Sequence, residues 1–216
     1  AWGILLAAST GREDVVFGAT VSGRPAGLAG VESMVGLFIN TLPVRVRVGA
    51  GESIESALVR LQGEQADLLD HHYLGLTEVQ RAAGIGNLFD TLTVFESYPV
   101  DEAGLAAQAS DIDGMAVTGV ESNDSTHYPL TLLIVSDDRI RLTLKYFEDL
   151  FDRGQIVSLA ARVERILTAF AQDTSRTIGD IDLLDDDERN LLLIERNATD
   201  HDVADRLLLD EFDDQV

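Results

Sequence analysis

Residues 17–47 read FGATVSGRPAGLAGVESMVGLFINTLPVRVR and set the architecture that the rest of the chain completes. The β-branched run from Val15 to Val21 predicts a buried strand, because it stops at the turn-forming residues Ser22 to Pro25. The chain becomes strand-like again from Gly36 to Val48, and Pro43 predicts that this second strand lies at a sheet edge or is broken in two. We therefore expect two strands joined by a long, glycine-containing loop.

Helices and further strands are predicted on the C-terminal side of this segment. Residues 52–69 carry apolar residues at helical spacing behind a candidate N-cap, Ser53, which predicts an amphipathic helix with one face on a sheet. The stretch 155–172 has a second apolar stripe, made of Ile156, Leu159, Val163, Leu167 and Phe170. Strands are predicted at 88–95, 130–135 and 140–146, the last two as a hairpin, and residues 101–119 as a mobile excursion. The mixture predicts a layered sheet-and-helix domain with a mixed sheet.

Composition excludes several classes of protein. The 216 residues are 45% hydrophobic, which is enough for one sizeable core, and no apolar run is long enough to cross a membrane. The net charge of −22 argues against nucleic acid as a partner, because phosphate binding needs a basic surface. With no cysteine there is no disulfide framework, which agrees with a cytoplasmic location. Residues 1–10 read as part of a helix and not as a signal peptide.

Charge is concentrated at the C-terminal end. Residues 173–216 hold 15 acidic residues against four arginines, so this last fifth carries half of the net charge. We expect a compact domain to end near residues 173–185 and a solvated acidic segment to follow it. The acidic run from Asp185 to Glu188 is interpreted as the start of a solvated helix at 188–196, and not as a metal site.

Several motifs together resemble one known family. The segment 17–47 contains S-G-R followed by G-x-F-x-N-T-x-P-x-R, with its fixed positions at Gly36, Phe38, Asn40, Thr41, Pro43 and Arg45. The stretches HHYLGLTEVQRAAG at 71–84, FDTLTVFESYP at 89–99 and NDSTHYPL at 123–130 match the later motifs of that family. On these residues the chain resembles the C-terminal half of a nonribosomal peptide synthetase condensation domain.

The tail extends the resemblance. Residues 178–200, IGDIDLLDDDERNLLLIERNATD, are similar to the linker between condensation and adenylation domains, and residues 207–216 are similar to the first adenylation helix. The resemblance implies a C-terminal condensation lobe at 1–177, a linker at 178–205 and the start of an adenylation domain at 206–216.

The family resemblance implies a fold and a chemistry. The fold would be α/β of the α+β type, a two-layer αβ sandwich with a mixed sheet related to chloramphenicol acetyltransferase, of which this chain forms one lobe. The activity would be amide bond formation between aminoacyl or peptidyl thioesters carried on the phosphopantetheine of carrier proteins, in secondary-metabolite and antibiotic biosynthesis. No cofactor would bind the chain directly.

The implied partners are a missing N-terminal lobe, peptidyl carrier proteins and a following adenylation domain. The family's H-H-x-x-x-D-G motif belongs to that N-terminal lobe, so no catalytic residue is assigned here and the chain alone is expected to be inactive. Two alternatives stay open: a non-catalytic docking or scaffold module for carrier proteins, and an epimerisation-type relative with the same fold.

Arg24 is the strongest candidate site residue. In the family pattern the arginine of S-G-R pairs with the aspartate of the histidine motif, so the resemblance implies that Arg24 clamps the two lobes together; a solvated loop arginine is the alternative. We also expect an exposed apolar face beside the Arg24 loop, where the second lobe would pack. Tunnel and motif positions implied by the resemblance are Ser22, Gly23, Gly36, Phe38, Asn40, Thr41, Pro43, Arg45, His127 and Tyr128.

Structural roles compete with these assignments. Asn40 and Thr41 either line the tunnel or satisfy backbone groups near Pro43. His127 and Tyr128 either belong to the tunnel wall or have a surface or core role. His71 and His72 are adjacent, yet Leu76 and Thr77 stand where the histidine motif needs Asp and Gly, so both are interpreted as residues at the negative end of a helix. Four histidines without the spacing of a ligand set, and no cysteine, predict no metal site.

Overall fold

The structure is a computed structural model that describes residues 1–25, 27–96, 126–136, 139–200 and 212. The excursion predicted at 101–119 and most of the adenylation-like helix at 207–216 lie outside the described residues. The chain divides into two compact units, Ala1–Ile181 and Asp182–Val216, and each is described by itself.

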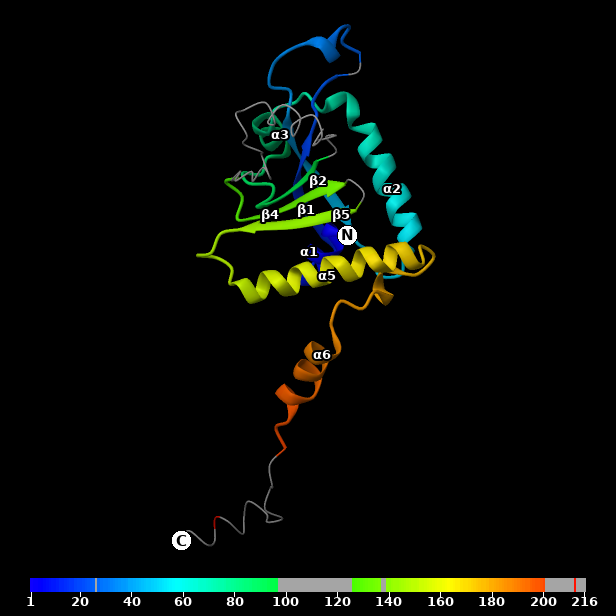
Figure 1. Ribbon diagram of the computed structural model, residues 1–216, viewed down its shortest axis with the longest axis vertical. Coiled ribbons are helices and arrows are strands. Elements are labelled where there is room, and N and C mark those ends of the chain that lie inside the picture. The colour runs from blue at the N-terminus through cyan, green and yellow to red at the C-terminus, as the bar shows by residue number, and fades with distance from the viewer. Residues whose placement is uncertain (26, 97–125, 137–138, 201–211, 213–216) are drawn as a thin grey trace, which may run out of the picture. The chain divides into compact units, whose positions relative to one another are not determined.

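A five-stranded mixed sheet forms the centre of the first unit, in the order β2-β1-β3-β4-β5 (Figure 1). Its strands are β1 Asp14–Val21, β2 Asn40–Arg47, β3 Thr91–Glu96, β4 Leu130–Ser136 and β5 Ile140–Tyr146. The outer pairs β1–β2 and β4–β5 are antiparallel, whereas β1–β3 and β3–β4 are parallel. The predicted mixed sheet and the predicted hairpin are both confirmed.

The edge position of β2 explains its proline. Pro43 has no amide hydrogen to donate to a ladder, and it lies opposite Gly18 in the outermost strand. The strand starts at Asn40 and not at the predicted Gly36. The physical reason is that the partner strand ends at Val21, opposite Asn40, and nothing in the register continues the ladder beyond that pair.

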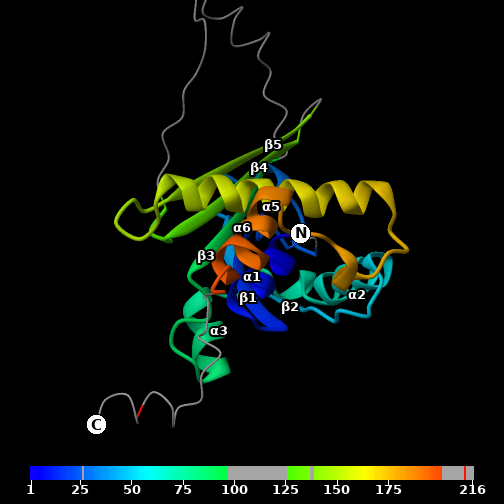
Figure 2. The ribbon, with the colours of Figure 1, turned by 90° about the horizontal axis from the view of Figure 1, so that it is seen from below.

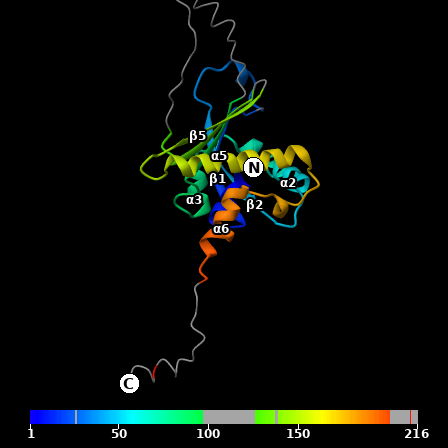
Figure 3. The same ribbon diagram turned by 60° about the horizontal axis from the view of Figure 1, so that its bottom comes forward.

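One face of the sheet is covered by the helices α1 Trp2–Thr10 and α5 Arg153–Gln172, which also contact each other (Figures 2 and 3). A capping box between Asp152 and Gln155 starts α5. The buried residues of α5 are Ile156, Val163, Ile166 and Ala169, so the buried stripe is rotated from the predicted one. Because α5 packs on α1 as well as on the sheet, Ile166 and Ala169 enter the core while Leu159, Leu167 and Phe170 are only half-buried.

The helix α2, Ile54–Asp67, begins as predicted, with the Ser53 side chain accepting a hydrogen bond from the Ser56 amide. Its apolar face is buried less than expected, since Ile54 is its one buried residue and Leu58 is exposed. An apolar hollow of about 360 Å³ separates Leu58 and Leu61 from the sheet. Full burial of α2 side chains is therefore limited to its first turn.

Shorter elements complete the two units. The structure forms a helix, α3, at Leu76–Ala83, where none was predicted. This helix has no buried residue. Three-residue 3₁₀ turns occur at Val31–Ser33, Leu69–His71, Ile178–Asp180 and Glu195–Asn197. In the second unit α6 spans Asp186–Leu193 behind an Asp185–Glu188 capping box, so the acidic run does start a helix, two residues earlier than predicted, because Asp185 is the cap. Among the residues that the structure describes, no helix is both long and apolar enough to span a bilayer.

The two faces of the sheet differ in character. Phe17, Thr93, Leu132 and Leu142 line the hollow beside α5, so they point to the helix-covered face. Side chains alternate along a strand, and their neighbours therefore point the other way. We call this opposite face, which carries Thr20, Thr41, Thr131 and Thr143, the threonine face.

Candidate functional site

The loop after β1 is held by a glycine and an arginine. Gly23 is buried with φ of 61°, and a Cβ atom there would lie 2.0 Å from the carbonyl oxygen of Phe38. Only glycine fits both the left-handed backbone and this close approach. Ser22, just before it, is exposed.

The Arg24 side chain, at the start of the same loop, binds residues farther along it. Its guanidinium donates hydrogen bonds to the carbonyl oxygens of Val31 and Met34, the latter at 3.2 Å, and lies 4.1 Å from the ring centroid of Phe38. The arginine therefore organises the loop from Pro25 to Phe38 from within. The ion pair between lobes that the resemblance implies for Arg24 stays a prediction.

Apolar side chains project from this loop. Residues 34–39, which we call the apolar arm, include Val35 and Leu37, whose exposed fractions are 102% and 90%. Met34 and Ile39 are also exposed, and Gly36 lies between them. The expected exposed apolar face beside Arg24 is confirmed.

Asn40 ties the start of β2 to the chain that follows α2. Its amide nitrogen donates to the carbonyl oxygens of His72 at 2.9 Å and Leu74 at 2.6 Å, and its side-chain oxygen accepts from the Thr41 amide. Thr41 itself pairs with Thr20 on the threonine face. Asn40 thus satisfies three backbone groups, and a contact of Asn40 or Thr41 with substrate stays a prediction.

The adjacent histidines lie at a different place from the one predicted. The helix α2 ends at Asp67, and His71 closes the following 3₁₀ turn, with His72 after it. The prediction that these histidines end the helix is therefore wrong by about one turn, because the chain tightens into 3₁₀ geometry from Leu69. Within the described part of the chain, no group of three acidic or histidine side chains could hold a metal ion.

His127 and Tyr128 belong to an aromatic cluster at the start of β4. Their ring centroids are 4.1 Å apart, and Tyr128 stacks on Phe89 at 5.5 Å. Burial raises the pKa of the Tyr128 hydroxyl above its ordinary value. Phe89 was not predicted as a site residue, although it opens the motif segment 89–99, because its partner is distant in sequence and only the fold joins them.

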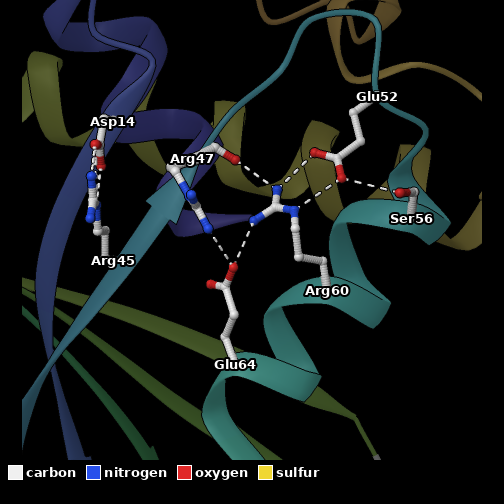
Figure 4. Close-up of polar contacts among 7 residues, drawn as sticks. All are labelled: Asp14, Arg45, Arg47, Glu52, Ser56, Arg60 and Glu64. Atoms are coloured by element: carbon white, nitrogen blue, oxygen red, sulfur yellow. Dashed lines mark hydrogen bonds and ion pairs between the residues drawn. The ribbon is translucent and has the colours of Figure 1, made fainter. Parts of the chain in front are cut away.

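An ionic network surrounds the far end of β2 (Figure 4). Arg45 makes a bidentate pair with Asp14, and its hydrogen bonds lower the pKa of that carboxyl. Farther along, Arg60 of α2 binds Glu52 at 2.7 Å and donates to the carbonyl oxygen of Arg47. This network was not predicted from the sequence, whose only signal for it is the spacing of Arg60 and Glu64, one helical turn apart.

The comparisons with known proteins agree on one family. A family model described as "Condensation domain" matches residues 1–193. The chain is 40% identical over 205 residues to a linear gramicidin synthase from Brevibacillus parabrevis, and 33% identical over 199 residues to bacitracin synthase 3 of Bacillus licheniformis. These alignments cover 94% and 92% of this chain but only 4% and 3% of those proteins.

Solved structures show the same fold. A four-domain nonribosomal peptide synthetase bound to AMP and glycine matches with a TM-score of 0.72 at 16% identity, over 86% of this chain and 15% of that one. The first condensation domain of the CDA synthetase matches with a TM-score of 0.64 at 21% identity, over 85% and 40%. The predicted fold class, related to chloramphenicol acetyltransferase, is confirmed. The chain belongs to the condensation domain family of nonribosomal peptide synthetases.

Proposed function

We propose that this chain is the C-terminal lobe of a condensation domain that joins carrier-bound thioesters. In the reaction the amine of an acceptor aminoacyl thioester attacks the carbonyl carbon of a donor thioester. A C–N bond forms, the C–S bond breaks, and the donor phosphopantetheine leaves as a free thiol. The observation that carries the proposal is the family match over residues 1–193.

The proposal assigns the proton-handling histidine to a second lobe. Neither His71 nor His72 is followed by the Asp and Gly of the histidine motif, so this chain by itself would be inactive. The exposed apolar arm supports the proposal, since Val35 and Leu37 would be covered by that lobe. The remaining parts of the proposal are carrier proteins as partners, a linker at 178–205 and an adenylation domain from residue 206.

The test supplies the chain with an N-terminal lobe that carries H-H-x-x-x-D-G, together with donor and acceptor carrier proteins loaded with aminoacyl thioesters. Mass spectrometry of the acceptor carrier is expected to show the dipeptidyl thioester with both lobes and none with either lobe alone. Carrier binding without any amide product would favour the docking module, and racemised donor without amide would favour the epimerisation-type relative.

The predicted clamp is tested in the same assay. Arg24→Ala is expected to abolish condensation, and Arg24→Lys to restore little of it, because a lysine cannot form the bidentate contact. Arg12→Ala is the matched control, since Arg12 is an exposed arginine before β1. Undiminished product with Arg24→Ala would refute the clamp.

A further inference from the structure

Phe89 lies directly on the backbone of β1. A Cβ atom added to Gly18 would lie 2.3 Å from the Cε2 atom of Phe89 and 2.9 Å from its Cζ atom. Gly18 is buried and pairs with Leu92 of β3 and Pro43 of β2. The ring of Phe89 therefore occupies the space that a side chain at Gly18 would fill. The ring can lie this close to the sheet because residue 18 is glycine.

The cluster above Phe89 is fixed from a second side. The Thr126 hydroxyl is 2.8 Å from the Thr131 hydroxyl, and the backbone amide of Tyr128 donates to Thr126. Thr131 is only 1% exposed, so this turn is anchored in the sheet. Tyr128 is half-buried on Phe89, while His127 at the top of the stack is exposed. The stack thus leads from a half-buried phenylalanine on Gly18 to an accessible imidazole.

The stack is on the threonine face. Gly18, Leu92 and Thr131 are in register across three neighbouring strands and form one row. Phe17, next to Gly18 in β1, points to the helix-covered face and is buried there among core residues. The two phenylalanines therefore contact the same strand from opposite sides, and only Phe89 supports groups that reach solvent.

We propose that Phe89 is a positioning residue that holds Tyr128 and His127 as a wall for uncharged, apolar aminoacyl side chains. The inference rests on the proposed condensation function. The exposed member of the wall is the His127 ring, packed on the half-buried Tyr128 ring, so the wall offers an aromatic surface for contact with apolar side chains, and none of its three members is acidic.

The experiment compares Phe89→Leu with Phe17→Leu in the two-lobed assay. Two donors, one with a large aromatic and one with a small aliphatic side chain, compete for the same acceptor. Phe89→Leu is expected to change the product ratio by about tenfold or more, and Phe89→Tyr, which keeps the ring, to retain the wild-type ratio. Phe17→Leu is the control, expected to lower stability without changing the ratio. Equal ratios in all variants would overturn the proposal.

A second readout does not depend on activity. In nuclear magnetic resonance spectra of the chain, Phe89→Leu is expected to shift the ring protons of Tyr128 and His127, because the ring current of Phe89 is lost, whereas Phe17→Leu leaves them in place. Unchanged shifts would overturn the positioning role. If Phe89→Leu does not fold, Tyr128→Leu removes the half-buried middle ring of the stack and must change the product ratio in the same direction. Absence of any amide with the wild type would refute the proposed function, and the ring shifts would still decide the positioning role.

Discussion

The two faces of the sheet have different roles: one contains the hydrophobic core, and the other carries the residues of the candidate site. The helix-covered face is closed by α1 and α5 and contains the fully buried residues Leu5, Val163 and Ile166. The threonine face carries hydroxyl groups and the aromatic stack that begins on Gly18. One strand serves both purposes, since Phe17 and Gly18 are neighbours in β1. Alternation along a strand therefore lets a single sheet build a core on one side and a candidate cleft wall on the other.

The largest expected effect breaks the helix-covered face. Ile166 is 0% exposed, and Ile166→Ala is expected to lower the free energy of unfolding by about 4 kcal/mol, through lost burial and a cavity. Leu133→Ala is the matched truncation on the threonine face, where Leu133 is half-buried, and should cost clearly less. Urea unfolding followed by circular dichroism measures both. Equal losses would contradict the division between the faces.

The next effect concerns the loop that continues β1 toward Arg24. Gly23→Ala is expected to cost about 3 kcal/mol, because the new methyl group meets the Phe38 carbonyl and the backbone is left-handed. Gly11→Ala separates the two causes, since Gly11 has φ of 65° and open space around it, and should cost about 1 kcal/mol. The same unfolding assay applies, and similar costs at the two positions would exclude the steric contribution.

A smaller effect sharpens the description of the threonine face. Thr131→Val keeps the volume but removes the hydroxyl that contacts Thr126, and is expected to cost about 1 kcal/mol. Thr143→Val, on the exposed end of the same face, is expected to cost almost nothing. Thermal unfolding of both variants checks the difference. A neutral Thr131→Val would mean that the turn at residues 126–128 is held by its aromatic contacts alone.

The smallest effect is the pH dependence of the ionic network at the far end of β2. Hydrogen bonds from Arg60 lower the pKa of Glu52, so the pair stabilises the fold above the ordinary pKa of glutamate and this contribution is lost as the pH falls through the lowered value. Glu52→Gln should cost less than about 1 kcal/mol near neutral pH, because both side chains are partly solvated. The difference between wild type and Glu52→Gln is expected to vanish in acid. Glu13→Gln, an exposed carboxylate outside the network, should show no such difference, and a persistent gap in acid would contradict the assignment.

Much of the fold was predictable from local patterns. The β-branched run before Ser22, the hairpin around residues 136–140 and the capped helix after Ser53 depend on neighbours in sequence, and all three are confirmed. The buried stripe of α5 was predicted less well. This helix contacts both α1 and the sheet, so it buries a wider part of its surface than the single apolar stripe in its sequence indicates. The start of β2 was misplaced for a similar reason: it is set by where its partner strand ends.

Motif spacing and local backbone preference were enough to identify the family, the strand-forming segments and the S-G-R loop with its glycine at position 23. The folded chain was needed to show that Phe89 rests on Gly18, that Asn40 binds the carbonyls after α2 and that Arg60 joins Glu52 to the end of β2. Each of these contacts joins residues between 8 and 71 positions apart. Such pairs leave no periodic signal in a single sequence, because the sheet order that brings them together is a property of the whole folded chain.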